Sequence, residues 1–199
     1  MLVNHRASAK GFTLVELVVT IAIIALLMLA AVPAIGSWMA NARVRSVAEG
    51  IQNGLRLTQA EAMRRSRLAT FRLTNASPSK DATPAAPATN WSVQAEHLLG
   101  VEPAASGAFV QGSVSGASSG VSIDGPPLLC FDSMGQLAPL ASSTSGLSAD
   151  CADKSPAVYT VAAASADRKL QVWVYLGGQV RMCDAAKTLS STVPDGCPA

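Results

Sequence analysis

The sequence has few charged residues. Asp, Glu, Lys and Arg make up 14% of its 199 residues, whereas roughly 25% is typical of a soluble protein, so some stretch must be nearly free of charge. This excludes a purely cytosolic globular domain. The formal net charge is only +2, which gives no support to a surface built throughout for nucleic acid. A chain of this length can form one domain with a core, but not two large ones.

The motifs of common catalytic and metal sites are also missing. There is no Walker loop, no H-E-x-x-H helix and no G-x-G-x-x-G dinucleotide turn. The four cysteines contain no C-x-x-C pair, and His97 is the single histidine after residue 11, so we expect no metal and no cofactor. A G-x-S-x-G match around Ser118 lies in a Gly/Ser-rich stretch without an apolar strand before it. We therefore expect no hydrolase and, more generally, no enzyme.

The missing charge is concentrated near the N-terminus. Leu17 to Ala42 contains no Asp, Glu, Lys or Arg over 26 consecutive residues, and its first part is apolar except for Thr20. An apolar run of 18 or more residues is a candidate transmembrane helix. His5, Arg6 and Lys10 precede the run, and such a positive flank places the N-terminus in the cytoplasm. Most of the chain is then predicted to lie outside the cytoplasm.

A secretory signal peptide is the alternative interpretation, with a cleavage site at Ala31 to Ala34. Two features oppose it. The apolar run is longer than the roughly 7–15 residues of a signal-peptide core. In addition, the carboxylate of Glu16 stands at its start, and an ionisable group entering a membrane indicates a function and a partner.

The residues Lys10-Gly11-Phe12-Thr13-Leu14-Val15-Glu16 resemble the processing motif of type IV prepilins and type II secretion pseudopilins. The resemblance implies that a prepilin peptidase cuts after Gly11 and methylates the new N-terminus of Phe12. It also implies that Glu16 neutralises the α-amino cation of a neighbouring subunit, since an opposite charge makes a buried carboxylate tolerable. Pro33 stands where many pilins have a helix-kinking proline.

The resemblance divides the chain into a leader peptide (1–11), a transmembrane or filament-core helix (12–40) and a periplasmic head (41–199). The implied location is the bacterial inner membrane, with one span and a cytoplasmic N-terminus, or an extracytoplasmic filament. The implied partners are the prepilin peptidase, other pilins or pseudopilins with their assembly machinery, and the membrane.

Beyond residue 41 the pattern predicts an α+β head. The helix is expected to continue to about Arg67, because apolar positions recur at spacings of three and four: Val44, Val47, Ala48, Ile51, Leu55, Thr58 and Ala62. Strands are expected at 91–95, 121–124, 128–131, 157–162 and 170–174, with a Gly177-Gly178 turn and a return over 179–183. Residues 75–90 read as a surface loop, and 100–120 as Gly/Ser/Ala-rich chain that supplies little core. The long helix should pack on a small antiparallel sheet.

Both ends of the head are similar to the GspH/FimT family of minor pilins and pseudopilins: Leu55 to Leu73 resembles the family's helix end and first strand, and Leu170 to Cys183 resembles its last hairpin. Four cysteines outside the cytoplasm indicate two disulfides, and three connectivities are open. The resemblance favours Cys183–Cys197, which ties the C-terminal tail to the last strand, and leaves Cys130–Cys151. A type IV pilus and a type II secretion pseudopilus both remain open as the assembly.

The alternative function is DNA binding by a minor pilin in natural transformation. Residues 43–72 hold seven arginines against two glutamates, whereas residues 73–199 hold six basic against ten acidic residues. We interpret the arginines as a solvated helix face or as a surface for neighbouring subunits. Some FimT-like pilins have a basic G-R-x-R segment, of which Gly178-Gln179-Val180-Arg181 keeps only Arg181. Weak DNA binding is expected, because phosphate attraction to an acidic head is small.

Overall fold

The structure is a computed structural model. It describes residues 11–80, 82–98, 101–103, 106–114, 120–142, 147, 149–153 and 155–198, apart from the side chains of residues 30–34. Three features of the sequence lie outside the described part: the leader before Gly11, the side chain of Pro33 with its predicted kink, and Ser118 of the G-x-S-x-G match.

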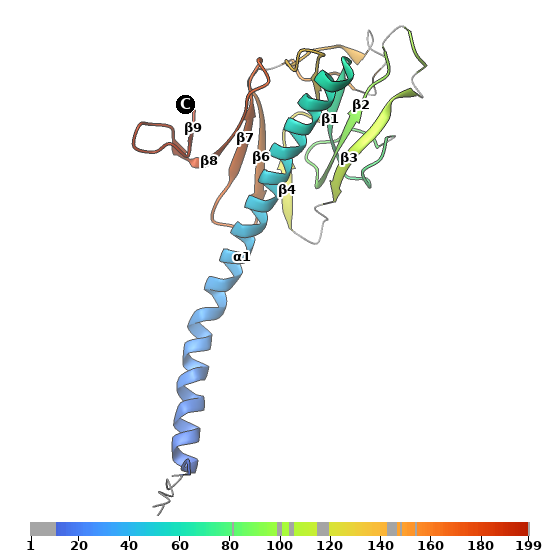
Figure 1. Cartoon of the computed structure of the whole chain (residues 1–199). Helices are drawn as coiled ribbons and strands as arrows, with labels where there is room; N and C mark the ends of the chain where they lie inside the picture. The colour runs from blue at the N-terminus through green and yellow to red at the C-terminus, as the bar shows by residue number, and fades with distance from the viewer. Residues whose placement is uncertain are drawn as a thin grey trace, which may run out of the picture.

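One helix, α1 (Leu14–Arg65), runs for 52 residues, about 80 Å at 1.5 Å per residue. It begins at Thr13, whose hydroxyl accepts the Glu16 N–H at 3.3 Å, and it ends at Ser66 in the left-handed conformation, φ 50°. Residues 14–39 project from the molecule and are called the stalk; the remainder of α1 packs on the head (Figure 1). The continuous helix predicted from the sequence is confirmed.

The head-packed part of α1 presents its predicted apolar face to the core. Six of the seven predicted positions are fully buried, and Val47 is partly buried: Val44, Ala48, Ile51, Leu55, Thr58, Ala62. Gly54 lies in the same face, and a Cβ there would sit 2.9 Å from atoms of Phe71 and Trp91. The helix therefore approaches the sheet more closely at Gly54 than a larger residue would allow.

The first sheet has four antiparallel strands in the order β3-β2-β1-β5. Their bounds are β1 (Ala69–Thr74), β2 (Asn90–Ala95), β3 (Ala108–Val114) and β5 (Leu128–Phe131). Phe71 lies at the centre of the core. Its ring stacks on Trp91 and meets Tyr159 edge-on, with centroids 5.5 Å apart in both pairs.

The second sheet has five strands in the order β4-β6-β7-β8-β9, antiparallel except for the parallel β8–β9 pair. Their bounds are β4 (Val121–Asp124), β6 (Ala157–Ala163), β7 (Leu170–Val174), β8 (Val180–Thr188) and β9 (Gly196–Cys197). A backbone bridge pairs Ile123 of β4 with Ala88, which lies just before β2, and so links the second sheet to the segment that enters the first. Helix α1 crosses both sheets (Figure 1), so the predicted α+β class is confirmed.

Every predicted strand forms within one residue of its expected start, but the sequence analysis missed β3 and β9 and ended β8 too early. β3 lies in the Gly/Ser/Ala-rich segment, where no apolar alternation marks a strand; its order comes from antiparallel pairing with β2. β8 continues past Cys183 to Thr188 because the C-terminal tail pairs with it as β9.

Two disulfides close the head. Cys130 is bonded to Cys151 and Cys183 to Cys197, with Cα atoms 5.6 Å and 5.0 Å apart. The first lies in a small separate core with Leu128 and Leu147, and the second holds β9 to β8. This is the connectivity that the resemblance implied.

Candidate assembly surface

The predicted cleavage site lies just before the helix. Gly11 and Phe12 are non-helical and exposed, with 79% of Phe12 accessible. A Cβ at Gly11 would meet no atom within 4 Å, so the fold does not require glycine at this position. The peptide bond between Gly11 and Phe12 joins two exposed residues.

Glu16 lies in the first turn of α1 and is exposed. A carboxylate is favoured here by the positive end of the helix dipole. Within the described part of the chain no basic side chain forms an ion pair with Glu16. Its side chain is therefore available to a cation from another molecule.

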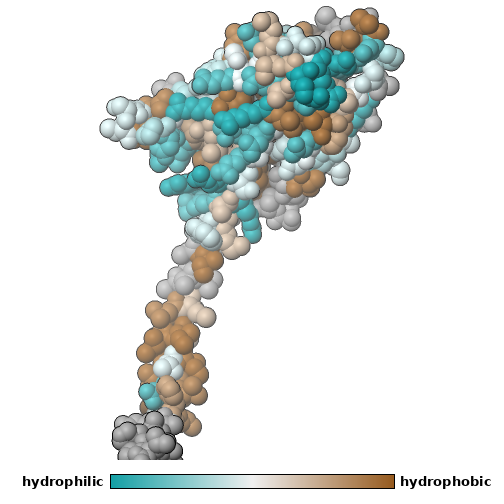
Figure 2. Space-filling model, viewed as in Figure 1, coloured by the Kyte–Doolittle hydropathy of each residue, from teal (hydrophilic) through white to brown (hydrophobic). Residues whose placement is uncertain are grey.

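The stalk exposes apolar side chains, and the face of it seen in Figure 2 is largely hydrophobic below the head. The exposed residues among those described are Leu14, Val15, Leu17, Val18, Val19, Ile21, Ile23, Ile24, Leu26, Leu27, Met28, Leu29, Ile35, Trp38 and Met39. The described residues form no helix both long and apolar enough to cross a membrane. A monomeric soluble protein rarely leaves a patch of this size uncovered, so the stalk is a surface that something else covers.

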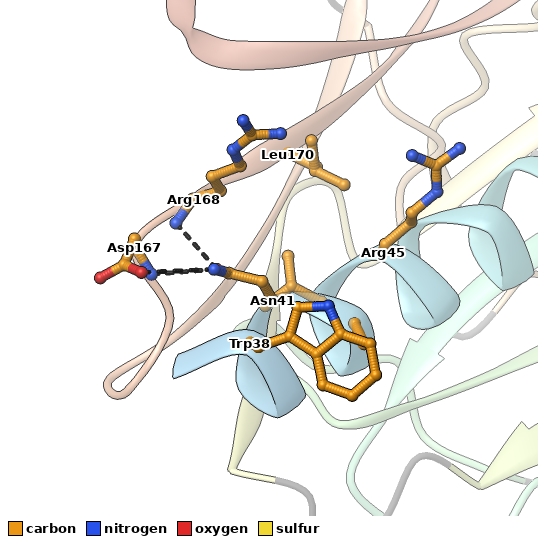
Figure 3. A pocket seen from close by; sticks show the side chains of 8 residues that line it. Trp38, Asn41, Arg45, Asp167, Arg168 and Leu170 are labelled. Carbon is orange, nitrogen blue, oxygen red and sulfur yellow. Dashed lines mark hydrogen bonds between the residues drawn. The ribbon is translucent and has the colours of Figure 1, made fainter. Parts of the chain in front are cut away.

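The stalk joins the head at a polar contact. Asn41 of α1 accepts hydrogen bonds from the backbone N–H groups of Asp167 and Arg168, at 3.0 Å and 3.2 Å, and donates to the Asp167 carboxylate at 3.3 Å. Figure 3 shows these contacts at the turn between β6 and β7, beside Trp38. A cavity of about 560 Å³ lies here, with Leu170 between the side chains of Arg45 and Arg168 (Figure 3). Asn41 thereby fixes the turn at the base of the head to the helix.

The arginine-rich end of α1 is mostly neutralised within the chain. Five of the seven arginines form ion pairs: Arg45–Glu49, Arg64–Glu61, Arg65–Glu61, Arg67–Glu102 and Arg72–Glu96. The local count overestimated the basic surface because Glu96 and Glu102 lie outside residues 43–72. The interpretation as a solvated face still fits Arg45 and Arg64, which are 69% and 62% exposed, whereas Arg72 is buried with its partner.

Glu61 is the centre of this network. Its carboxylate accepts two hydrogen bonds from Arg64, at 2.7 Å and 3.0 Å, and one from Arg65 at 2.7 Å. The Arg64 hydrogen bonds lower the pKa of Glu61 from its ordinary value of 4.5, burial opposes this, and Arg65 adds to the lowering.

The Glu61 network predicts a pH-dependent stability. A carboxyl whose pKa is lowered by folding stabilises the folded state above its unfolded pKa, and this is lost as the pH falls through the folded pKa. We expect Glu61→Gln to reduce the unfolding free energy by about 1–2 kcal/mol at pH 7. The difference should vanish below the folded pKa. Urea unfolding of the full chain in detergent micelles at pH 7 and at pH 3 or below measures it.

The control for this prediction is Glu49→Gln, because the Arg45–Glu49 pair is well exposed, at 69% and 47% of the two side chains. It should change stability by less than about 1 kcal/mol at either pH. A Glu61→Gln loss of equal size at both pH values would contradict a contribution from the ionised carboxylate.

The C-terminal tail is hydrogen-bonded to Arg181, the one arginine that this chain has in common with the basic G-R-x-R segment. The Arg181 guanidinium donates to the Pro194 carbonyl at 2.8 Å, and the nearby Lys187 and Asp195 form an ion pair. Arg181 thus holds the tail near the Cys183–Cys197 disulfide. Among the described residues, no group of three or more His, Cys, Asp or Glu side chains is arranged to hold a metal ion.

The N-terminal segment matches a known sequence family. Residues 6–32 match the family model described as the prokaryotic N-terminal methylation motif. This match confirms the prepilin-like N-terminus predicted from Gly11, Phe12 and Glu16. No curated protein sequence matches the chain.

Three solved structures are similar in fold. The type IV minor pilin FimU of Pseudomonas aeruginosa PAO1 is 15% identical, over 77% of this chain and 98% of FimU, with a TM-score of 0.45. A second crystal form of FimU is 14% identical, over 77% and 94%, with a TM-score of 0.45. The minor pseudopilin EpsH from the type 2 secretion system of Vibrio cholerae is 12% identical, over 71% and 97%, with a TM-score of 0.46.

Sequence reasoning found the N-terminal residues and missed the contacts that join distant segments. The Glu61 pairs with Arg64 and Arg65 could have been found, because spacings of three and four place charges side by side on a helix. No local signal marks Asn41 as the partner of Asp167, 126 residues away.

Proposed function

We propose that this chain is a non-enzymatic minor pilin or pseudopilin of the GspH/FimT type. It is cut after Gly11 by a prepilin peptidase, methylated at Phe12, and assembled with other pilins or pseudopilins into an inner-membrane-based filament. The assembly is a type IV pilus or the pseudopilus of a type II secretion system.

The observation that carries this proposal is the continuity of the methylation motif with the helix. Residues 6–32 match the motif. Helix α1 begins within this segment, at Leu14, and continues to Arg65. The same helix therefore presents an exposed apolar surface at one end and forms part of the head core at the other. A filament subunit needs an apolar helix to pack against its neighbours, and the stalk supplies one that is continuous with the head.

Residues 12–40 are proposed as the membrane anchor before assembly and as the filament core afterwards, with the head in the periplasm. The basic residues before the helix support this orientation. Both disulfides lie in the head, and disulfides persist in compartments such as the periplasm. In the filament, exposed Glu16 would meet the α-amino cation of a neighbouring subunit.

DNA binding is the weaker candidate. The guanidinium of Arg181 is engaged by the tail, and five of the seven arginines near the end of α1 are paired with carboxylates. Phosphate contacts dominate non-specific affinity for DNA. Few basic side chains remain to make them.

Mass spectrometry of the intact protein tests the proposal. Co-expression with a prepilin peptidase should remove residues 1–11 and add a methyl group to the amino terminus of Phe12. The protein expressed alone should keep its leader. A new N-terminus at Ile35 would instead establish a secretory signal peptide, and an unchanged mass in the presence of an active peptidase would overturn the proposal.

A further inference from the structure

Strand β3 leaves one edge of the first sheet open. It pairs with β2 on one side, and within the described part of the chain no strand or bridge pairs with its other side. By contrast, the opposite edge strand, β5, is bridged to Leu137. An unpaired edge presents a row of backbone N–H and C=O groups that match another extended chain.

The sequence does little to protect this edge. Natural sheets usually shield an edge with charged residues, proline or a bulge. Pro103 to Ile123 contains no charged residue, and β3 contains no proline. The pairing register places one bulge in β3, at Val110. The regular open edge is therefore Gln111–Val114.

A groove lies beside this part of β3. Two adjoining cavities of about 270 Å³ and 410 Å³ are bounded by α1 and β3 and share Gly50, Trp91 and Ser113 in their linings. Trp91 pairs with Ser113 and Val93 with Gln111. Directly paired residues point to the same face of a sheet, so Gln111 and Ser113 face the helix with Trp91. The lining of the larger cavity, beside Gln111 and Ser113, is uncharged, and Arg43 lines the smaller one.

We propose that Gln111–Val114 is a docking site for an extended, uncharged segment of another polypeptide. The segment adds to β3 as a further strand through backbone hydrogen bonds, the recognition mode of strand addition. Every second side chain of the segment enters the groove beside Trp91, and those that face the larger cavity are apolar or small because its lining offers no charged partner.

A second copy of this chain cannot pair with the same edge if both copies are anchored in one membrane, as the proposed function requires. Two identical edges joined about a two-fold axis pair antiparallel. This symmetry reverses every direction in the sheet, so the two α1 stalks would point to opposite ends of the dimer. Subunits anchored in one membrane have their stalks on the same side.

Amide hydrogen exchange of the full chain in detergent micelles tests the proposal. The probe is a capped peptide with the sequence of residues 89–95, an uncharged segment that includes β2, the strand that already pairs with β3. Millimolar peptide should slow exchange in Gln111–Val114 by about threefold or more, because strand pairing protects amides. Unchanged exchange in this segment would overturn the proposal.

Charged variants separate docking at the edge from peptide binding elsewhere. Gln111→Lys places a charge in the groove and should abolish the protection. If this variant unfolds more easily in urea than the native chain, Ser113→Lys takes its place in the same experiment. Leu176→Lys, at an exposed position outside this sheet, should leave the protection intact. Protection that survives both edge variants would contradict the site. Protection that rises with protein concentration in the absence of peptide would make a second copy the occupant and overturn the assignment. Neither outcome depends on whether residues 1–11 are cleaved.

Discussion

Glu96→Ala is expected to reduce the unfolding free energy by about 3–5 kcal/mol, because it removes one partner of a buried ion pair. Glu96 follows β2 and accepts hydrogen bonds from the Arg72 guanidinium and the Thr70 hydroxyl, both at 2.6 Å. The side chains of Arg72 and Glu96 are each only 8% exposed. Without the carboxylate, the positive charge of Arg72 stays in a site that water reaches poorly.

Urea unfolding of the full chain at pH 7 measures this loss. The double variant Arg72→Leu/Glu96→Leu should recover much of the stability, since replacing a buried pair by apolar residues is often nearly neutral. Glu49→Ala removes an exposed ion pair instead and should change stability by less than about 1 kcal/mol. A Glu96→Ala loss as small as that of Glu49→Ala would show that the pair does not stabilise the head.

Gly11→Val is expected to block processing completely, which is the largest functional effect predicted for one substitution. A Cβ at this position meets no atom within 4 Å, and Gly11 lies outside the head, so head stability should stay unchanged. A membrane peptidase that accepts only glycine before the cut would reject valine. Co-expression with a prepilin peptidase followed by intact-mass measurement should show that residues 1–11 are retained.

Gly36→Ala is the matched control. Gly36 is also exposed, with no atom within 4 Å of an added Cβ, but it lies far along α1 from the cut. Its leader should be removed as in the native chain. Efficient cleavage of the Gly11→Val protein at the same bond would contradict a role for Gly11 in recognition.

The helix and most strands could be predicted because their signals are local. An apolar residue every three or four positions marks the buried face of α1, and Leu170, Val172 and Val174 alternate along β7. The N-terminal motif could also be read, since its glycine, aromatic and carboxylate residues lie within a few positions of one another.

Features set by tertiary pairing could not be predicted in the same way. β3 has weak intrinsic strand character and is ordered by β2, so no pattern within Ala108–Val114 marks it. The charge balance of the arginine-rich segment depends on Glu96 and Glu102, which reach Arg72 and Arg67 only after the sheet forms. Both errors arise from counting neighbours along the chain rather than in space.

The position of Asn41 has a mechanical consequence. In a filament under tension, the stalk would pull on the head along the axis of α1. Asn41 links the base of that helix to the β6–β7 turn, and the buried face above it is continuous with both sheets. The force would therefore be shared by many buried side chains between α1 and the two sheets. These contacts would have to break together, whereas strands that are pulled apart from one end break one pair at a time.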